Sequence, residues 1–304
     1  MSTSTEETGF LSQGVRLGAG HNRPAHERLR NNRGLPCIVI GHGLGGTREC
    51  GLQPYAEKFS QAGFHVLCFD YRGFGSSDGE PRQYVNVRMQ LDDWAAAIAH
   101  ARTLAGVDPE RIALWGSSFS GGHVIAAAVE DGKVAAVSNQ GSMMDGLASV
   151  LFLLKQEGLL QVGKVMAHAT VDGMRGLFGL SRHTLPVVGE PGSLAVLTSP
   201  GSKTGYLALA PPDWPNEISL SWMFGLALYR PNVMAARLPC PALFCVATGD
   251  TVVPPAAMED GVRRAGSKAE VKRYPVGHFE IYVGEAFQQC SRDQAEFFTR
   301  SLKP

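Results

Sequence analysis

The stretch Arg111-Ile-Ala-Leu-Trp-Gly-Ser-Ser-Phe-Ser-Gly-Gly122 decides how this sequence folds. Its first residues form an apolar strand, its Gly and Ser residues form a tight turn, and a helix-compatible run follows from His123 to Val129. This layout is typical of a nucleophile elbow, in which a Ser lies on a strained strand-to-helix turn with its hydroxyl exposed. The alternative interpretation is a Ser/Gly-rich turn that only caps a helix.

Steric crowding selects one Ser of this turn as the nucleophile. A sharp turn requires small residues two positions before and two positions after the reactive Ser. Ser118 has Gly116 and Ser120 at those positions. Ser117 would instead be flanked by a Trp and a Phe, and Ser120 lies too far beyond the end of the strand. We therefore predict Ser118 as the nucleophile, although the motif calls for Gly where this chain has Ser120.

Composition and charge limit the classes of protein to which the chain can belong. It has 304 residues, 44% of them hydrophobic, and its 28 basic side chains balance 28 acidic ones. A net charge of zero argues against nucleic acid or a membrane surface as a partner, because both attract basic patches. No apolar run approaches the ~20 residues that span a bilayer, and the polar start does not resemble a signal peptide. We expect a cytoplasmic protein with a frayed N-terminus.

Strand-like and helix-like segments alternate along most of the chain. The predicted strands are residues 37–41, 64–70, 111–116, 134–139, 242–247 and 270–274. The predicted helices are residues 48–61, 87–105, 121–130, 255–265 and 285–302. Residues 10–30 are expected to supply two antiparallel edge strands. This alternation predicts an α/β fold, with a mostly parallel central sheet and helices on both faces.

The alternation breaks over residues 142–235, which are apolar but lack the rhythm of strands. Six of the nine Met residues fall here: Met143, Met144, Met166, Met174, Met223 and Met234. We interpret residues 142–235 as a mostly helical cap insertion over the carboxyl edge of the sheet, and residues 1–141 and 236–304 as the core. Met side chains adapt to varied apolar ligands. The alternative is that these Met residues only fill the interior of the insertion.

Two further residues complete a catalytic set with Ser118. A hydroxyl is a weak nucleophile and needs a base within hydrogen-bond reach, oriented by a third group. Asp250 and His278 each follow a predicted strand, so both are expected at the carboxyl edge of the sheet, where sites form. The chain order Ser, Asp, His is a known order for a serine triad. We predict His278 as the base and Asp250 as the acid, with Asp145 as the alternative acid.

The segment Gly41-His-Gly-Leu-Gly-Gly46 follows the first central strand and has two interpretations. In the first, the backbone amides of Leu44 and Phe119 form an oxyanion hole, and His42 shapes the loop. In the second, the segment is the G-x-G-x-x-G of a dinucleotide site, with Asp70 as the ribose-binding acid. We favour the first interpretation, because the second leaves the three predicted triad residues without a role.

No metal or organic cofactor is predicted. The six Cys residues contain no C-x-x-C pair, which argues against a zinc or redox site, and we interpret them as buried free thiols. A Gly-rich loop over residues 70–79 lacks the Gly-Lys-Ser/Thr of a phosphate-binding loop. We expect a rigid structural loop there, in which Arg72 pairs with an Asp such as Asp78.

These motifs together resemble the α/β-hydrolase superfamily over about residues 10–141 and 236–304. The chain is most similar to the branch of serine aminopeptidase-like and Xaa-Pro dipeptidyl-peptidase-like hydrolases, with their esterase and acyltransferase relatives. The resemblance rests on His42-Gly43, Asp70-Tyr-Arg-Gly-Phe-Gly-Ser-Ser77, Gly116-Ser-Ser-Phe-Ser-Gly-Gly-His123, Gly249-Asp250 and Gly277-His278. It implies the α/β-hydrolase fold and a serine triad. Ser118 argues against haloalkane dehalogenases and epoxide hydrolases, which carry Asp at the elbow. The insertion resembles a cap domain by position only.

The sequence therefore predicts a serine hydrolase that cleaves an ester or related acyl bond of an apolar small molecule through an acyl-enzyme. The expected partner is this substrate, without nucleic acid or membrane, and a homo-oligomer is left open. Two alternatives remain: an acyltransferase, C–C hydrolase or peptidase that uses the same triad, and a ligand receptor that retains the pocket without catalysis.

Overall fold

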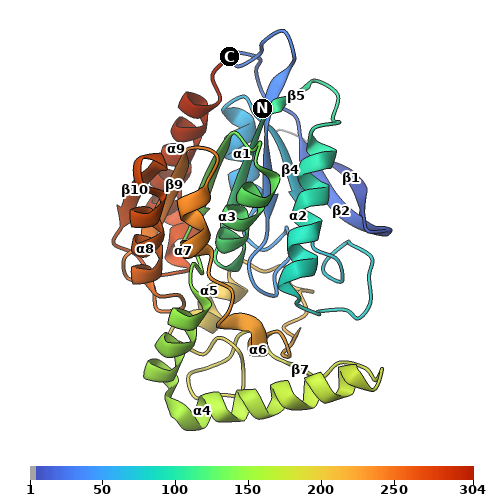
Figure 1. The fold of residues 1–304 in the computed structure, drawn as a ribbon, viewed down its shortest axis with the longest axis vertical. Coiled ribbons are helices and arrows are strands. Elements are labelled where there is room, and N and C mark those ends of the chain that lie inside the picture. Colours follow the sequence, from blue (N-terminus) through green and yellow to red (C-terminus); the bar gives the residue numbers. More distant parts are fainter. Residues whose placement is uncertain (1–4) are drawn as a thin grey trace.

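A central eight-stranded sheet organises the protein, whose computed structural model describes residues 5–304 (Figure 1). The strands are β1 (Thr5–Ser12), β2 (Val15–Asn22), β3 (Leu35–Gly41), β4 (His65–Phe69), β5 (Val107–Ser117), β6 (Ala136–Gln140), β9 (Ala242–Ala247) and β10 (Ala269–Tyr274). Their order in the sheet is β1-β2-β4-β3-β5-β6-β9-β10. β2 pairs antiparallel with β1 and β4, and the remaining neighbours pair in parallel. The carboxyl ends of the six parallel strands therefore meet at one edge.

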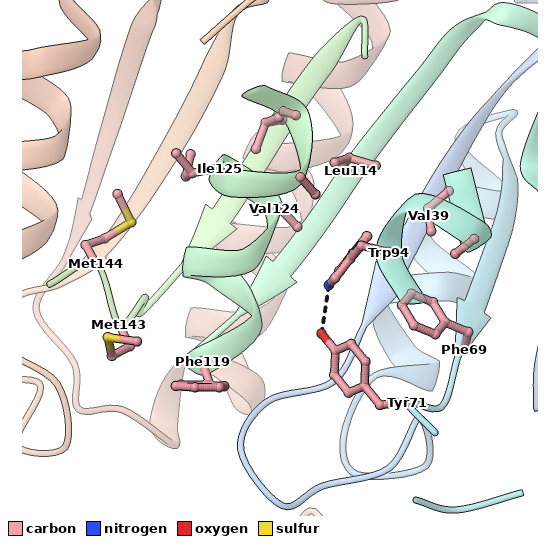
Figure 2. Close-up of a cluster of buried hydrophobic side chains, with 14 of the residues drawn as sticks. Val39, Phe69, Tyr71, Trp94, Leu114, Phe119, Val124, Ile125, Met143 and Met144 are labelled. Carbon is pink, nitrogen blue, oxygen red and sulfur yellow. Dashed lines mark hydrogen bonds between the residues drawn. The ribbon is translucent and has the colours of Figure 1, made fainter. Parts of the chain in front are cut away.

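Helices cover both faces of this sheet, because its parallel strands are apolar on both sides. The helices of the core are α1 (Gln53–Gln61), α2 (Val87–Ala101), α3 (Phe119–Asp131), α8 (Pro255–Ala265) and α9 (Gly284–Ser301). Buried side chains of α2, α3 and α8 form one apolar cluster with the sheet, and those of α1 and α9 form a second on the opposite face. Figure 2 shows part of the first cluster, where Trp94 and Val124 face Val39 and Leu114 of the sheet.

The predicted fold class is confirmed, and each predicted strand overlaps an observed one. The antiparallel edge strands lie earlier than predicted, at residues 5–12 and 15–22 instead of within 10–30. The reason is the hairpin turn at Gln13 and Gly14, whose φ angles of 48° and 85° match a two-residue hairpin. The expectation of a frayed start is wrong for residues 5–8, which pair along their whole length with β2. Residues 1–4 lie outside the described residues.

Residues 142–235 connect the neighbouring strands β6 and β9, and most of them lie in the lower part of Figure 1, whereas their last helix, α7, lies beside α3 and α8 of the core. Their elements are α4 (Gly146–Leu177), β7 (Thr184–Leu185), α5 (Ser202–Leu207), β8 (Ile218–Ser219), α6 (Met223–Leu226) and α7 (Pro231–Met234). α4 is interrupted at Gly158, whose φ of 79° is not helical. Beyond α4 the elements are short, because repeated Pro residues remove backbone donors and interrupt helices. The segment is thus helical mainly in its first half.

Buried polar contacts tie the Gly-rich loop after β4 to α2. The Arg72 guanidinium donates to the Asp93 carboxylate at 2.6 and 2.9 Å and to the Ser12 hydroxyl at 2.7 Å. The expected pairing with Asp78 is therefore wrong. Asp93 lies on the sheet-facing side of α2 and is fully buried, so it needs a charged partner more than an accessible Asp does.

The structure also bears on the predicted free thiols and on the expected absence of a membrane-spanning segment. All six Cys side chains are buried and free, as predicted. Burial raises the pKa of Cys37 to about 12, which keeps this thiol protonated and unreactive at neutral pH. Among residues 5–304, no helix combines the length and the hydropathy that crossing a bilayer requires.

Candidate active site

Ser118 forms the turn between β5 and α3. Its φ of 58° and ψ of −125° are unfavourable for a residue with a side chain. Two hydrogen bonds hold it there: the Ser118 N–H donates to the Gln140 carbonyl at 2.9 Å, and the Ser118 carbonyl accepts from the Met143 N–H at 2.9 Å. The segment around the end of β6 thus stabilises a strained turn that presents the Ser118 hydroxyl at the carboxyl edge of the sheet.

The residues around this turn fit the elbow that the sequence predicts. A Cβ at Gly116 would lie 2.5 Å from the Ser120 carbonyl oxygen, so only Gly is tolerated there. Ser120 is fully buried, and its hydroxyl accepts a hydrogen bond from the Tyr71 hydroxyl at 3.4 Å. The Tyr71 hydroxyl in turn accepts from Trp94 Nε1 at 2.8 Å (Figure 2). The Ser at position 120, where the motif calls for Gly, is therefore accommodated by buried hydrogen bonds that link Trp94, Tyr71 and Ser120.

The structure brings Ser118, His278 and Asp250 into one chain of hydrogen bonds. Nε2 of His278 lies 3.1 Å from Oγ of Ser118, and Nδ1 of His278 lies 2.6 Å from Oδ2 of Asp250. The other Asp250 oxygen accepts from the Val252 and Val253 N–H groups at 2.8 and 2.9 Å. A base within reach of the hydroxyl proton, oriented by a fixed carboxylate, is the arrangement that nucleophilic catalysis by Ser requires.

Asp145, the alternative acid, has a different position. It caps α4, where its Oδ1 accepts from the Ala148 N–H at 3.1 Å. Its Oδ2 accepts from Arg230 at 2.7 Å and from Asn232 at 3.0 Å. Burial opposes ionisation of this carboxyl, but its hydrogen bonds, first among them that from Arg230, hold its pKa below the usual value. The geometry therefore places Asp250 beside His278, whereas Asp145 binds residues at the start and end of the insertion.

The two residues predicted to supply the oxyanion hole lie beside Ser118. Leu44 and Phe119 line the same cavity as Ser118. Within residues 5–304, neither of their backbone N–H groups donates a hydrogen bond. Phe119 is the first residue of α3, so its N–H is one of the free donors at the positive end of the helix. Both N–H groups thus lack an acceptor within the described residues, as the predicted role requires.

The glycine segment after β3 does not have the form of a dinucleotide site. It leads into turns, and α1 begins only at Gln53, so the glycines do not open a helix that faces a pyrophosphate. The Asp70 carboxylate is buried and accepts from the Arg48 N–H at 2.7 Å and from the Ser76 N–H and hydroxyl at 3.0 and 2.9 Å. Asp70 is thus buried and bound to its own chain through both oxygens, which argues against the dinucleotide interpretation.

A cavity of about 340 Å³ opens next to Ser118. No charged residue is among its eighteen lining residues, and thirteen of them belong to residues 142–235. The lining is Leu44, Ser118, Phe119, Met143, Ser149, Val150, Leu153, Val162, Met166, Val196, Leu197, Trp222, Met223, Phe224, Leu226, Ala227, Val252 and Val253. The insertion therefore supplies most of the apolar surface of the cavity that Ser118 borders.

A second, much smaller space of about 30 Å³ borders both Ser118 and His278. It is large enough to hold a water molecule. Its other walls include Tyr206 of α5, together with Phe279 and Tyr282, which follow His278. Sequence reasoning missed these three residues. Phe279 directly follows His278 and Tyr282 lies four positions after it, so their place in the chain was a usable signal, whereas nothing in the local pattern marks Tyr206.

Comparisons with known proteins agree with this architecture. A family model described as the alpha/beta hydrolase fold matches residues 36–161. The quorum-quenching protein AidA of Acinetobacter baumannii is 39% identical over 295 residues, covering 96% of this chain and 93% of the relative. The polyketide transferase claH of Penicillium crustosum is 26% identical, covering 94% and 91%. The crystal structure of the alpha/beta hydrolase GrgF from Penicillium sp. sh18 superposes with a TM-score of 0.80, at 24% identity and 99% coverage of both chains.

Proposed function

The chain belongs to the α/β-hydrolase superfamily, and from this premise we propose that it is a serine hydrolase that cleaves ester or related acyl bonds of apolar small molecules. The hydrogen-bonded chain of Ser118, His278 and Asp250 carries the proposal. Support comes also from the two backbone N–H groups beside Ser118, those of Leu44 and Phe119, which have no acceptor within residues 5–304. A nucleophile, a base, an acid and two oxyanion donors are the parts that acyl-enzyme chemistry needs.

The proposed reaction begins when Oγ of Ser118 attacks the substrate carbonyl carbon and Nε2 of His278 takes the hydroxyl proton. The carbonyl oxygen becomes an anion, which the N–H groups of Leu44 and Phe119 stabilise. His278 then donates its proton to the leaving oxygen as the carbon–oxygen bond breaks, and an acyl-enzyme remains. Asp250 accepts from Nδ1 of His278 throughout, which fixes the tautomer and stabilises the imidazolium.

Deacylation uses the same groups in the reverse roles. His278 takes a proton from a water molecule, which attacks the acyl carbon, and the proton returns to Oγ of Ser118 as the carboxylic acid leaves. The space of about 30 Å³ that borders both Ser118 and His278 can hold this water.

The substrate class follows from the larger cavity. A charged acyl group would lose its hydration on entering this cavity of about 340 Å³ and would find no charged partner among the lining residues. An apolar acyl chain would instead gain by leaving water. A quorum-quenching protein as relative also favours a small molecule over a polymer as the substrate.

Acyl transfer is the second candidate function, and the polyketide transferase among the relatives favours it. In that case an alcohol or amine, instead of water, accepts the acyl group from Ser118. Product analysis with and without added alcohols distinguishes the two: transfer predicts new esters, and hydrolysis predicts carboxylic acid alone.

A fluorophosphonate probe followed by peptide mapping tests the central assignment. We expect the probe on Ser118 in the wild type, and no labelling of Ser118→Ala. The same variant should lose p-nitrophenyl ester turnover by roughly 10⁴- to 10⁶-fold while remaining folded. Ser120→Ala is the matched control, because Ser120 is a buried hydroxyl of the same turn, and it should keep the label. A label on Ser117 or Ser120, or turnover by Ser118→Ala, would contradict the proposed function.

A further inference from the structure

Two aromatic side chains of the insertion bind the loop that carries the Leu44 amide. The Tyr206 hydroxyl donates to the Leu44 carbonyl at 2.9 Å, and Trp214 Nε1 donates to the Gly45 carbonyl at 3.0 Å. The two rings stack on each other, with centroids 4.6 Å apart and planes 19° from parallel. Each is less than 10% exposed. Each ring therefore packs as an apolar body while its single polar atom binds a backbone carbonyl.

The peptide before Leu44 is held from the other side, by the core. Nδ1 of His42 donates to the Gly43 carbonyl at 2.9 Å, and Nε2 accepts from the Tyr71 N–H at 3.3 Å. The Gly46 N–H also donates to the Gly43 carbonyl, at 3.3 Å. Three successive carbonyls of this loop are thus bound, the first by His42 and the next two by the insertion. His42 therefore shapes the loop, as the sequence predicts, and both of its ring nitrogens are occupied.

The loop lies so close to the insertion that it has no room to shift toward it. A Cβ at Gly45 would lie 2.7 Å from Cγ2 of Val187, and Gly45 has a φ of +67°. A Cβ at Gly46 would lie 2.9 Å from the Tyr206 hydroxyl oxygen. The contact with the insertion therefore defines the path of residues 43–46, and does not merely cover them.

Because a peptide unit is planar, fixing a carbonyl fixes the direction of the N–H across the same bond. The Leu44 N–H shares its plane with the Gly43 carbonyl, and the next plane is fixed at the Leu44 carbonyl by Tyr206. We propose that Tyr206 and Trp214 are positioning residues: they hold the two peptide planes that follow Leu44, while His42 holds the plane of the Leu44 N–H, so that this N–H keeps its place as an oxyanion donor. This inference rests on the proposed function, and it makes the insertion part of the catalytic geometry as well as of the pocket.

The helix α5 also reaches the loop that carries His278. A Cβ at Gly205 would lie 2.6 Å from Cβ of Phe279, the residue after His278. The ring of Phe279 lies 5.8 Å from that of Tyr206 and 5.0 Å from that of His278, between centroids. The short helix α5 thus packs against both the loop after β3, which carries Leu44, and the loop after β10, which carries His278.

Tyr206→Phe tests the proposal, because it removes one hydroxyl and keeps the stack with Trp214. We expect kcat for a p-nitrophenyl ester to fall about 3- to 10-fold, the range for one net hydrogen bond, with KM changed less than about twofold. A trifluoromethyl ketone, which forms an anionic adduct with the reactive Ser, should lose affinity by the same factor, since it uses the same N–H groups. Trp214→Phe should behave alike and serves if Tyr206→Phe does not fold.

Tyr55→Phe is the matched control, because it also removes a buried Tyr hydroxyl, which donates to the Ile281 carbonyl at 3.0 Å. It should leave kcat and trifluoromethyl ketone affinity unchanged, whatever its effect on thermal stability. Unchanged affinity in both Tyr206→Phe and Trp214→Phe, or an equal loss in Tyr55→Phe, would overturn the inference. Retained turnover in Ser118→Ala would instead defeat the proposed function itself, so the two failures are distinguishable.

Discussion

The sheet core and the insertion between β6 and β9 are ordered by different physical means. In the core, strands such as β3, β4 and β9 are buried at every position and paired along their length, so backbone ladders and apolar burial coincide. In the insertion the strands have two residues each. Fourteen of the sixteen large apolar side chains that are exposed within residues 5–304 lie in this segment. The core is therefore close to saturated in its contacts, whereas the insertion keeps apolar surface free.

In the insertion, hydrogen bonds to one buried carboxylate join segments that in the core would be joined by strand pairing. Asp172, fully buried on α4, accepts from Nε and Nη2 of Arg182 at 2.8 Å each, and from the N–H groups of His183, Leu220 and Ser221 at 3.0, 3.0 and 2.8 Å. Five hydrogen bonds thus join three chain segments at one charge. The core is therefore ordered by repeated backbone contacts along its strands, whereas the insertion is ordered by a few polar side chains.

The largest expected effect distinguishes Asp250, which follows a strand of the core, from Asp145, which lies at the start of the insertion. Asp250→Asn should lower kcat by roughly 10⁴-fold, because the amide favours the wrong tautomer of His278. Asp145→Asn should lower kcat less than about tenfold, because Asp145 binds Arg230 and Asn232 and not His278. Steady-state kinetics of both variants on one ester checks this. The reverse ranking would place the acid in the insertion and remove the distinction between the two regions.

The next effect concerns the cavity that the insertion lines. Each methylene buried from water contributes about 0.8 kcal/mol, so kcat/KM should rise about fourfold per carbon along a series of p-nitrophenyl esters until the cavity is full. Leu153→Glu places a charge on the lining and should flatten the series while sparing the acetyl ester. Leu151→Glu, on the same helix but 58% exposed, is the control and should keep the rise. A flat series in the wild type, or a preference for peptides with a free amino terminus, would contradict the proposed substrate class.

His123 lies where the two regions meet and should make stability depend on pH. Its Nδ1 accepts from the hydroxyl of Tyr229 in the insertion at 2.7 Å, and its Nε2 donates to Gln90 of α2 at 2.9 Å. Burial lowers the pKa of His123 to about 3. Below pH 6.5 the unfolded chain therefore binds a proton that the folded chain does not. The free energy of unfolding should fall by up to about 1.4 kcal/mol per pH unit as the pH drops from about 6.5 toward 3.

Denaturant unfolding of His123→Gln across this pH range measures the contribution. In this variant the free energy of unfolding should depend less steeply on pH, by up to about 1.4 kcal/mol per pH unit, because Gln does not titrate. An unchanged slope in His123→Gln would show that protonation of this side chain is not what couples stability to pH.

The smallest effect is expected at exposed apolar positions of the insertion. Leu159 and Leu160 follow the interruption of α4 and are 79% and 76% exposed. Replacing both with Gln should change the free energy of unfolding by less than about 0.5 kcal/mol per residue, because exposed side chains make few contacts. Val165→Ala, at a buried position of the same helix, should cost more. Denaturant titrations check both, and a large loss in the Leu variants would mean that this surface is covered in solution.

The local pattern of the sequence was sufficient to predict the sheet and to place Ser118, Asp250 and His278 at one edge of it. The strand 242–247 was predicted with the bounds that the structure shows, because a run buried on both faces is apolar throughout. Ser118 was identifiable because an elbow permits only small neighbours at fixed spacing. Asp250 and His278 followed because parallel strands end at one edge, so residues after different strands meet in space. Each of these inferences uses only short-range spacing and chain order.

Tertiary structure alone decided the surroundings of these groups. Tyr206 lies 162 positions from Leu44 along the chain, and Trp214 lies 169 positions from Gly45. The choice between Asp250 and Asp145, the partner of Arg72 and the five contacts of Asp172 also became visible only in space. The physical reason is that periodicity records which residues are buried and how the backbone turns locally. It does not record which distant side chain satisfies a given buried carbonyl or carboxylate.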